Sequence, residues 1–328
     1  MNRYGWLSVF LLLVLAVGLT ILWGEWKGAM DQAAWFELVD EHYTEPSGLL
    51  RTYGREPEEL FLSETVGLYF MQALASGEEE RFMRQVDVLE ERWLVREAEG
   101  VFMPWKLKNG EKATVNALID DLRIIRALEE GANVFQNAAL RELADELLDT
   151  IMRVQVTQEG WLADFYDWTY GVTSERLILS YGQVAPTESY VALLGEAADL
   201  MSPFVPLAYD LNEDRFLPQR EVHMVDQFLI MIDMERQGFD TGPFQEWLRK
   251  EWSNEGMISG RYLTSDVSGN GIESVSVYAM MGTYAELRGD HDLKRAADKK
   301  REALAFSFDS YEDVHFFDLY GFIGRNAY

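Results

Sequence analysis

The segment FLSETVGLYFMQALAS (residues 61–76) decides how the fold is interpreted, because it reads as a buried helix that carries an acid. Glu64 lies between Leu62 and the apolar run that follows. A lone carboxylate there costs on the order of several kcal/mol of desolvation free energy unless it is paired, protonated or exposed in a cavity. The position of Glu64 therefore indicates either a partner elsewhere in the chain or a chemical task.

The composition excludes several classes of function. The chain has 328 residues, of which 48% are hydrophobic, and a formal net charge of -27. A surface of this charge repels phosphate backbones, so we expect no nucleic-acid partner. The sequence contains no cysteine, which excludes disulfides, thiolate metal sites, cysteine nucleophiles and a lipid-modified N-terminal cysteine. We expect no metal and no cofactor.

The N-terminal residues 1–28 are predicted to attach the chain to a membrane. The run GWLSVFLLLVLAVGLTILW, residues 5–23, carries no charge and is bracketed by Trp6 and Trp23. As a helix it would span roughly 28 Å at about 1.5 Å per residue, close to the thickness of a bilayer core. A cleavable signal peptide is the alternative, and then the protein would be secreted. In both cases residues 29–328 form one domain on the extracellular side.

Apolar periodicity near 3.6 dominates the rest of the chain and predicts about twelve helices. They cover 31–43, 58–75, 78–95, 113–130, 136–154, 187–200, 202–209, 221–237, 242–251, 272–288, 291–306 and 311–324. Only SGRYLTSD and ERLILSY read as strands. Twelve helices in one domain predict an all-α fold of six hairpins. One way to close them is an (α/α)6 toroid, and a bundle or an open solenoid would also fit.

Two long segments between the predicted helices are rich in aromatic residues. The first, 94–112, contains Trp105, and the second, TQEGWLADFYDWTYGVTSERLILSYGQ, begins at Thr157. Long ordered loops are often functional, and aromatic rings suit the flat C–H faces of sugars. The alternative is a loop that folds its aromatic residues under itself. The predicted substrate-binding residues here are Trp105, Tyr166, Asp167, Trp168 and Tyr181.

The segment ATVNALIDDLRIIRALEEGANVF (113–135) places two further acids on a helix. Asp120 and Asp121 are adjacent and therefore about 100° apart around the axis. Asp121 precedes Ile124 and Ile125 by three and four residues, so we expect it near the buried stripe. The alternative is an acid of the first turn that bonds backbone N–H groups or pairs with an arginine.

These segments resemble glycoside hydrolase family 8. ALIDDLRIIRALEEGANVF resembles its signature helix, A-[ST]-D-[AG]-D-x-x-[IM]-A-x-[SA]-L, and FLSETVGLYFMQAL is similar to its S-E-G-x-G-Y-G-M segment. The residues that match are Ala117, Asp121, Ile124, Ala127, Leu128 and Phe135 in the first, and Ser63, Glu64, Gly67 and Met71 in the second. Later segments follow in the family's order, so the resemblance extends over most of residues 58–325.

The resemblance implies an (α/α)6 toroid that binds a β-linked polysaccharide and hydrolyses it with inversion. Glu64 would be the general acid, since partial burial raises the pKa of a carboxyl and keeps its proton available. Asp121 would orient the sugar or the water, and Asp120 would bind substrate.

The catalytic base is not defined by the resemblance. The family carries it in a Y-D-A-x-R segment, and a gapless placement on PQREVHMVDQFLIMIDM puts His223 on that aspartate. Asp226, one helical turn away, is the first candidate for a displaced base, and Asp167 is the second. Asp226 could equally be a structural acid. His223 is a possible substrate-binding residue, with no metal-ligand spacing around it.

We therefore expect a membrane-anchored glycosidase that cleaves an exopolysaccharide or a β-glucan, with an exopolysaccharide synthesis complex as a candidate partner. Two alternatives stay open. One is a catalytically degenerate protein of the same fold that binds glycan or assists exopolysaccharide assembly. The other is a helical scaffold with no glycan role.

Overall fold

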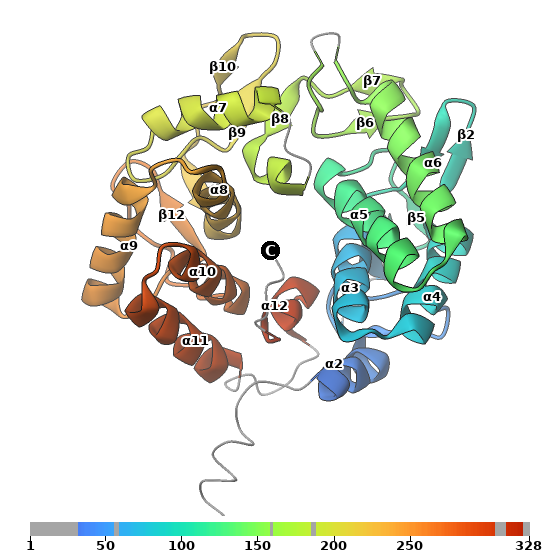
Figure 1. Cartoon of the computed structure of the whole chain (residues 1–328), viewed down its shortest axis with the longest axis horizontal. Coiled ribbons are helices and arrows are strands. Elements are labelled where there is room, and N and C mark those ends of the chain that lie inside the picture. Colours follow the sequence, from blue (N-terminus) through green and yellow to red (C-terminus); the bar gives the residue numbers. More distant parts are fainter. Residues whose placement is uncertain (1–31, 56–58, 158–159, 185–187, 306–312, 324–328) are drawn as a thin grey trace, which may run out of the picture.

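The computed structural model describes residues 32–55, 59–157, 160–184, 188–305 and 313–323. Their helices form a ring with an inner and an outer layer (Figure 1), which is the predicted (α/α)6 arrangement. The expected membrane segment, residues 1–28, lies outside the described residues. None of the helices in the described ranges has both the length and the apolar character that a membrane span requires.

Six elements close the inner ring. Each packs against the next, and the last packs against the first. In order they are α3 (Ser63–Ser76), α5 (Leu118–Val134), the 3-10 helix η3 (Leu179–Val184), α8 (Met224–Gln237), α10 (Val275–Leu287) and α12 (Phe316–Gly321). Because an outer helix returns the chain after each inner one, the inner elements all begin at the same end of the ring.

The outer layer consists of six α-helices that alternate with the inner elements along the chain. They are α2 (Gln32–Leu38), α4 (Glu79–Val88), α6 (Ala138–Val154), α7 (Glu188–Asp199), α9 (Gly242–Glu255) and α11 (His291–Ala305). Two π-helical turns, η1 (Val39–Tyr43) and η2 (Leu89–Trp93), extend α2 and α4.

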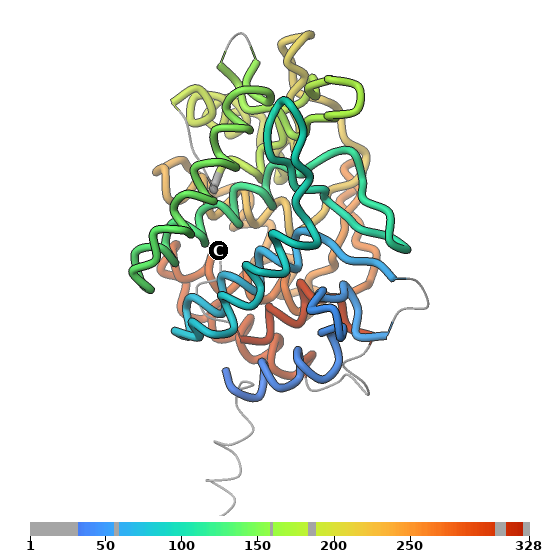
Figure 2. Tube along the Cα trace, turned by 90° about the vertical axis from the view of Figure 1, so that its right-hand side faces the viewer, coloured from blue at the N-terminus to red at the C-terminus, as the bar shows by residue number. Residues whose placement is uncertain are grey.

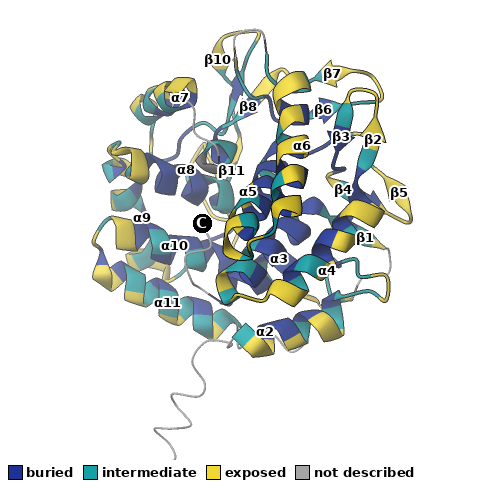
Figure 3. Ribbon diagram, turned by 45° about the vertical axis from the view of Figure 1, so that its right-hand side comes forward, coloured by how far each residue is buried: buried dark blue, intermediate teal, exposed yellow. Residues whose placement is uncertain are grey.

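The sequence explains which helices lie inside. In α8 every residue from Gln227 to Met234 is buried, whereas α9 buries only Phe244 and Leu248 among its residues. A helix that is apolar on all sides is enclosed by others, and one with a single apolar stripe covers a surface. Figure 3 shows this difference as dark inner helices and outer helices with exposed faces.

Short strands join the helices and carry some side chains toward the ends of the ring. They are β1 (Leu60–Leu62), β2 (Val95–Glu97), β3 (Gly100–Phe102), β4 (Lys106–Lys108), β5 (Glu111–Lys112), β6 (Tyr166–Asp167), β7 (Val172–Thr173), β8 (Arg176–Ile178), β9 (Ala208–Asp210), β10 (Arg215–Phe216), β11 (Glu221–His223) and β12 (Arg261–Leu263). All pairings are antiparallel. The fold is thus mostly helical, and the sequence revealed only the strands at β8 and β12.

The helix predicted over 202–209 is wrong. Residues 202–207 are not helical, and Ala208–Asp210 is strand β9. Pro203 and Pro206 interrupt this segment, and proline both lacks the N–H that a helix requires and restricts the residue before it. The inner ring is completed instead by η3, which sequence analysis assigned to a strand and a loop.

The ends of the described chain hold the ring closed. The indole N–H of Trp35 in α2 donates to the carbonyl of Leu319 in α12, at 3.0 Å, and the Tyr43 hydroxyl donates to the carbonyl of Val314, at 2.8 Å. Both aromatic residues are fully buried. Figures 1 and 2 show the blue α2 lying beside the red α12. An outer helix of the N-terminal part therefore fixes the last inner helix.

Replacing Trp35 with alanine should destabilise the whole ring. We expect a loss of about 3–5 kcal/mol in the free energy of unfolding, because a buried ring and a buried hydrogen bond are both removed. Urea unfolding followed by circular dichroism measures this loss. Trp105→Ala is the control, because the Trp105 side chain is 36% exposed. Equal losses in the two variants would contradict the role of Trp35 in closure.

Candidate active site

Four inner helices carry an acid in their first turn. These acids are Glu64 in α3, Asp120 in α5, Asp226 in α8 and Asp318 in α12. Because the inner helices begin at the same end, their first turns face a common region. The charges of Asp120, Asp226 and Asp318 all act on the Glu64 carboxyl. The structure thus brings the predicted residues Glu64, Asp120 and Asp226 into one region, together with Asp318.

Glu64 is the acid whose protonation is most altered. Burial raises the pKa of its carboxyl to about 8, and the negative charges of Asp120, Asp226 and Asp318 act in the same direction. The Arg123 guanidinium opposes them. Glu64 nevertheless keeps part of its surface exposed, so solvent or a ligand can still reach it. A carboxyl of this kind keeps its proton at neutral pH and can donate it.

Asp120 is held in a buried ion pair. The Arg123 guanidinium donates to one of its oxygens at 2.9 Å and the Ser63 hydroxyl donates to the other at 2.7 Å. A Cβ atom added at Gly67 would lie 3.0 Å from Cδ of Arg123, so the missing side chain leaves room for the arginine against α3. Burial raises the pKa of Asp120, while Arg123 and Ser63 lower it.

Asp226 is partly exposed and is held by two neighbours. The Ser180 hydroxyl donates to its Oδ1 at 2.8 Å, and Nδ1 of His223 lies 3.3 Å from Oδ2. His223 is the last residue of β11 and precedes α8, so strand and helix position the pair together. Tyr181, beside Ser180, belongs to the same region. Burial raises the pKa of its phenol, and the charges of Asp120 and Asp226 raise it further.

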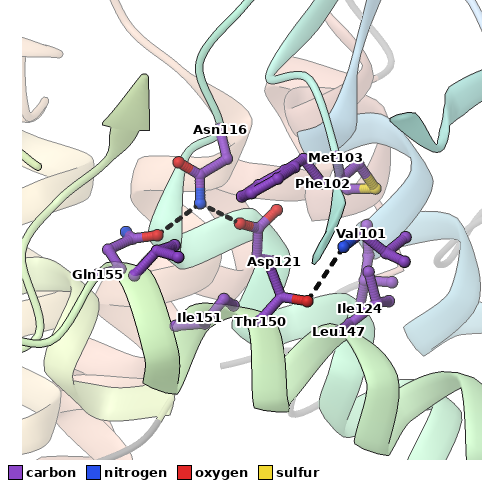
Figure 4. Close-up of a pocket in the computed structure, with 11 residues that line it drawn as sticks. Val101, Phe102, Met103, Asn116, Asp121, Ile124, Leu147, Thr150, Ile151 and Gln155 are labelled. Atoms are coloured by element: carbon purple, nitrogen blue, oxygen red, sulfur yellow. Dashed lines mark hydrogen bonds between the residues drawn. The ribbon is translucent and has the colours of Figure 1, made fainter. Parts of the chain in front are cut away.

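Asp121 lies in a different place from Glu64. It is buried and faces the outer helix α6, in a small cavity that Ile151 and Gln155 also line (Figure 4). The amide of Asn116 donates to its Oδ2 at 2.5 Å, and its Oδ1 has no hydrogen-bond partner among the residues that the structure describes. Burial raises the pKa of Asp121 well above its ordinary range. The cavity of about 10 Å³ is close to the space that one water molecule requires.

The Asn116 side chain gives Asp121 a structural role. Its amide also donates to Gln155 at 2.7 Å, and its carbonyl oxygen accepts the Tyr166 backbone N–H at 2.7 Å. Gln155 in turn donates to the carbonyl of Ala163 at 2.8 Å. This network fastens the aromatic segment to α5 and α6. The charge of Asp120 acts on the Glu64 carboxyl, whereas its neighbour Asp121 faces α6.

The aromatic segment that begins at Thr157 packs two of its rings against Phe102 of β3. Tyr166 and Trp168 stack on Phe102, with ring centroids 5.6 and 5.0 Å away. Asp167 caps its own turn by accepting the backbone N–H groups of Thr169 and Tyr170 at 3.0 and 3.3 Å. The structure does not join Asp167 to the group around Glu64 by any hydrogen bond among the described residues.

Trp105 is the aromatic residue with the clearest link to Glu64. Its carbonyl accepts the backbone N–H of Ser63 at 3.0 Å and the Ser63 hydroxyl at 3.2 Å. Its indole is exposed and carries the Lys106 ammonium 4.5 Å above the ring. The loop 103–105 is therefore anchored next to the residue that precedes Glu64.

Asp318 was not among the site residues predicted from the sequence. The helix predicted over 311–324 would place this acid in mid-helix, whereas α12 begins at Phe316 and Asp318 lies in its first turn. Its Oδ1 accepts the Ser274 hydroxyl at 2.6 Å and the Ser276 backbone N–H at 3.0 Å. The signal that could have found it was a first-turn acid, as in α3, α5 and α8. Within the described ranges, no three acids, histidines or cysteines are arranged to hold a metal ion.

Comparison with known proteins identifies relatives of the fold. No family model matches the chain. YdaJ of Bacillus subtilis (strain 168), named as a lipoprotein, is 26% identical over 251 residues, which is 71% of this chain and 66% of YdaJ. The matched part thus spans about two thirds of YdaJ. PssZ of Listeria monocytogenes is 25% identical with a TM-score of 0.77, covering 88% of this chain and 93% of PssZ.

Family 8 enzymes share the architecture. The endoglucanase Cel10 of Klebsiella pneumoniae, a family 8 glycosyl hydrolase, is 13% identical with a TM-score of 0.61 and covers 83% of this chain and 98% of Cel10. The chain is therefore structurally similar to family 8 glycosyl hydrolases and to PssZ, and distantly homologous to YdaJ. This confirms the resemblance found in the sequence. At these identities the similarity shows the fold and leaves the activity to the site residues.

The pKa of Glu64 makes the stability of the protein depend on pH. Its folded-state pKa of about 8 exceeds the ordinary value of 4.5, so its contribution is complete below about pH 4.5 and is lost as pH rises through 8. Glu64→Gln is neutral at every pH. It should therefore unfold at a higher temperature than wild type at pH 9, by about 2 °C or more, with the difference vanishing near pH 4.5.

Calorimetry over this pH range measures the difference. Glu79→Gln is a matched control, because Glu79 lies in the first turn of the outer helix α4 and is exposed. A Glu64→Gln variant whose melting temperature tracks wild type at every pH would contradict the raised pKa.

Proposed function

We propose that the protein is an extracytoplasmic glycoside hydrolase that cleaves a β-linked polysaccharide, an exopolysaccharide or β-glucan, with inversion. The observation that carries the proposal is the pairing of unlike carboxyls in one region. Glu64 is a carboxyl with a pKa of about 8, and Asp226 is a partly exposed carboxylate whose charge reaches it. Inverting glycosidases require such a pair, one protonated and one ionised, on opposite sides of the scissile bond.

In the proposed reaction Glu64 donates its proton to the leaving glycosidic oxygen. Asp226 accepts a proton from the water that attacks the anomeric carbon from the opposite face. Glu64 becomes a carboxylate in this step, and the nearby Arg123 guanidinium stabilises the new charge. Solvent then restores the proton to Glu64 and removes the one on Asp226. Ser180 and His223 orient Asp226 toward the water.

Asp120 takes the part that sequence analysis gave to Asp121. It lies beside Ser63 and raises the pKa of Glu64, so it keeps the acid protonated. Trp105 and Tyr181 are the proposed stacking surfaces. Trp105 is exposed next to Ser63, and Tyr181 shares the surroundings of Asp120 and Asp226. Tyr166 and Trp168 stack on Phe102, which holds the aromatic segment against β3.

The location follows from the sequence and from one relative. We propose that residues 1–28 attach the domain to the outer face of the membrane. The lipoprotein name of YdaJ supports an extracytoplasmic place, although this chain has no cysteine to carry a lipid. A polysaccharide synthesis complex at the same membrane is the proposed partner.

A glycan-binding protein without catalysis is the second candidate. It is favoured by the position of His223, which replaces the aspartate that the family uses as base. In that case Asp226 would be held by Ser180 and His223 only to shape a binding surface.

The test uses the full chain in detergent and a panel of β-glucans, xylan, chitosan and bacterial exopolysaccharides, with new reducing ends as the readout. We expect Glu64→Gln and Asp226→Asn each to lower kcat by about 10²–10⁴-fold, with Glu79→Gln unchanged. Activity should fall as pH rises through about 8, since Glu64 must hold its proton.

The anomer of the first product, followed by NMR, should be inverted. Retention would contradict the proposed pairing of Glu64 with Asp226. Tight binding of one glycan with no cleavage by wild type would support the second candidate instead.

A further inference from the structure

We infer that the buried pair Tyr190–Asp233 is a positioning device that holds η3, and through it Asp226, in place. The inference deepens the proposed function, on which the assignment of Asp226 as base rests. Neither residue is among the groups whose charges act on the Glu64 carboxyl. Tyr190 lies on the outer helix α7 and Asp233 lies on the inner helix α8, seven residues beyond Asp226.

The element that needs support is η3. It occupies one of the six inner positions with a 3-10 helix of six residues. Helices of this type have poorer hydrogen-bond geometry than α-helices and are uncommon beyond three or four residues. A cavity of about 30 Å³, lined by Tyr181, Gly182 and Tyr190, lies against it. A 3-10 segment beside a cavity therefore gains from an attachment to the outer layer.

Tyr190 supplies such an attachment. Its hydroxyl lies 2.7 Å from the carbonyl of Leu179, the first residue of η3, and the residue is buried. A Cβ atom added at Gly182 would lie 1.9 Å from Cζ of Tyr190. The η3 backbone therefore rests directly on the phenol ring, and only glycine permits this approach.

The single hydroxyl hydrogen of Tyr190 limits the hydrogen bonds that it can make, and this determines the role of Asp233. Tyr190 has one hydroxyl hydrogen, yet its oxygen also lies 2.8 Å from Oδ2 of Asp233, which is 3% exposed. Both Leu179 O and a carboxylate are acceptors, so one hydrogen cannot serve both. Both of these contacts are satisfied at once if Asp233 carries a proton and donates it to Tyr190, which then donates to Leu179.

Other groups around Asp233 agree with this arrangement. Burial raises the pKa of its carboxyl, while hydrogen bonds from Tyr190 and Gln237 and the charge of Arg236 lower it. Arg236 and Gln237 lie on α8 and are exposed. Of the groups that act on the Asp233 carboxyl, Tyr190 is the one on α7.

The chain of contacts ends at the proposed base. Ser180 follows Leu179 directly, and its hydroxyl donates to Asp226 at 2.8 Å. Asp226 and Asp233 lie two turns apart on α8, so η3 is attached to this helix at two points. The first contact orients the Asp226 carboxylate, and the second fixes the segment that makes the first.

The experiment measures Asp226 without relying on catalysis. His223 Nδ1 lies 3.3 Å from Asp226, so the midpoint of its ring C–H titration by NMR reports the state of that carboxylate. The full chain is compared with Ser180→Ala, Tyr190→Phe, Asp233→Asn and Gly182→Ala. Tyr284→Phe is the matched control, because Tyr284 is fully buried and its hydroxyl contacts Thr241 on the far side of α8 from η3. His223→Gln assigns the signal.

We expect Tyr190→Phe and Gly182→Ala to move the His223 midpoint in the same direction as Ser180→Ala. Asp233→Asn should leave it unchanged, because the asparagine amide still donates to Tyr190. Tyr284→Phe should lower the melting temperature and leave the midpoint unchanged. On a cleaved substrate, Tyr190→Phe should lower kcat by about 10-fold with little change in KM.

Two results would overturn the inference. One is a His223 midpoint in Tyr190→Phe equal to wild type while Ser180→Ala shifts it. The other is an Asp233→Asn variant that behaves like Tyr190→Phe, which would mean that Asp233 accepts rather than donates. If no glycan is cleaved by wild type but the midpoints behave as expected, the positioning device stands and the proposed function fails.

Discussion

The interaction on which the site depends is the buried ion pair of Asp120 and Arg123. It joins the first turns of α3 and α5, because Ser63 bonds the same carboxylate and Gly67 leaves space for the arginine. A buried ion pair adds little net stability and is costly when one partner is lost. Here it places a negative and a positive group beside Glu64 at once, and the balance among them and burial sets the pKa of that acid.

Much of the fold could be predicted because it is written in local periodicity. Helices that are apolar on every side became the inner layer, and helices with one apolar stripe became the outer layer. The third inner position could not be read in this way. The segment 179–184 has no helical repeat of its own, and its shape depends on Leu207 and Tyr190, which lie outside the segment.

The site was predicted in part for the same reason. Glu64 stands out in the sequence because an acid interrupts an apolar run. The choice between Asp120 and Asp121 could not be made, since both are buried and differ only in which layer each one faces. That difference depends on where helices α3 and α6 lie against α5, which is tertiary information. Asp318 was missed because the start of its helix was placed several residues too early.

The contact between α2 and α12 has a mechanical consequence. Tension applied on the N-terminal side of residue 32, as in a tethered domain, is transmitted first to α2 and its bonds from Trp35 and Tyr43 to the α12 segment. Trp35 and Phe36 of α2 also contact Tyr69 of α3, so the force reaches α12 and α3 together. Under load, the strain would concentrate where the last and first inner helices meet, and Asp318 and Glu64 lie in the first turns of these two helices.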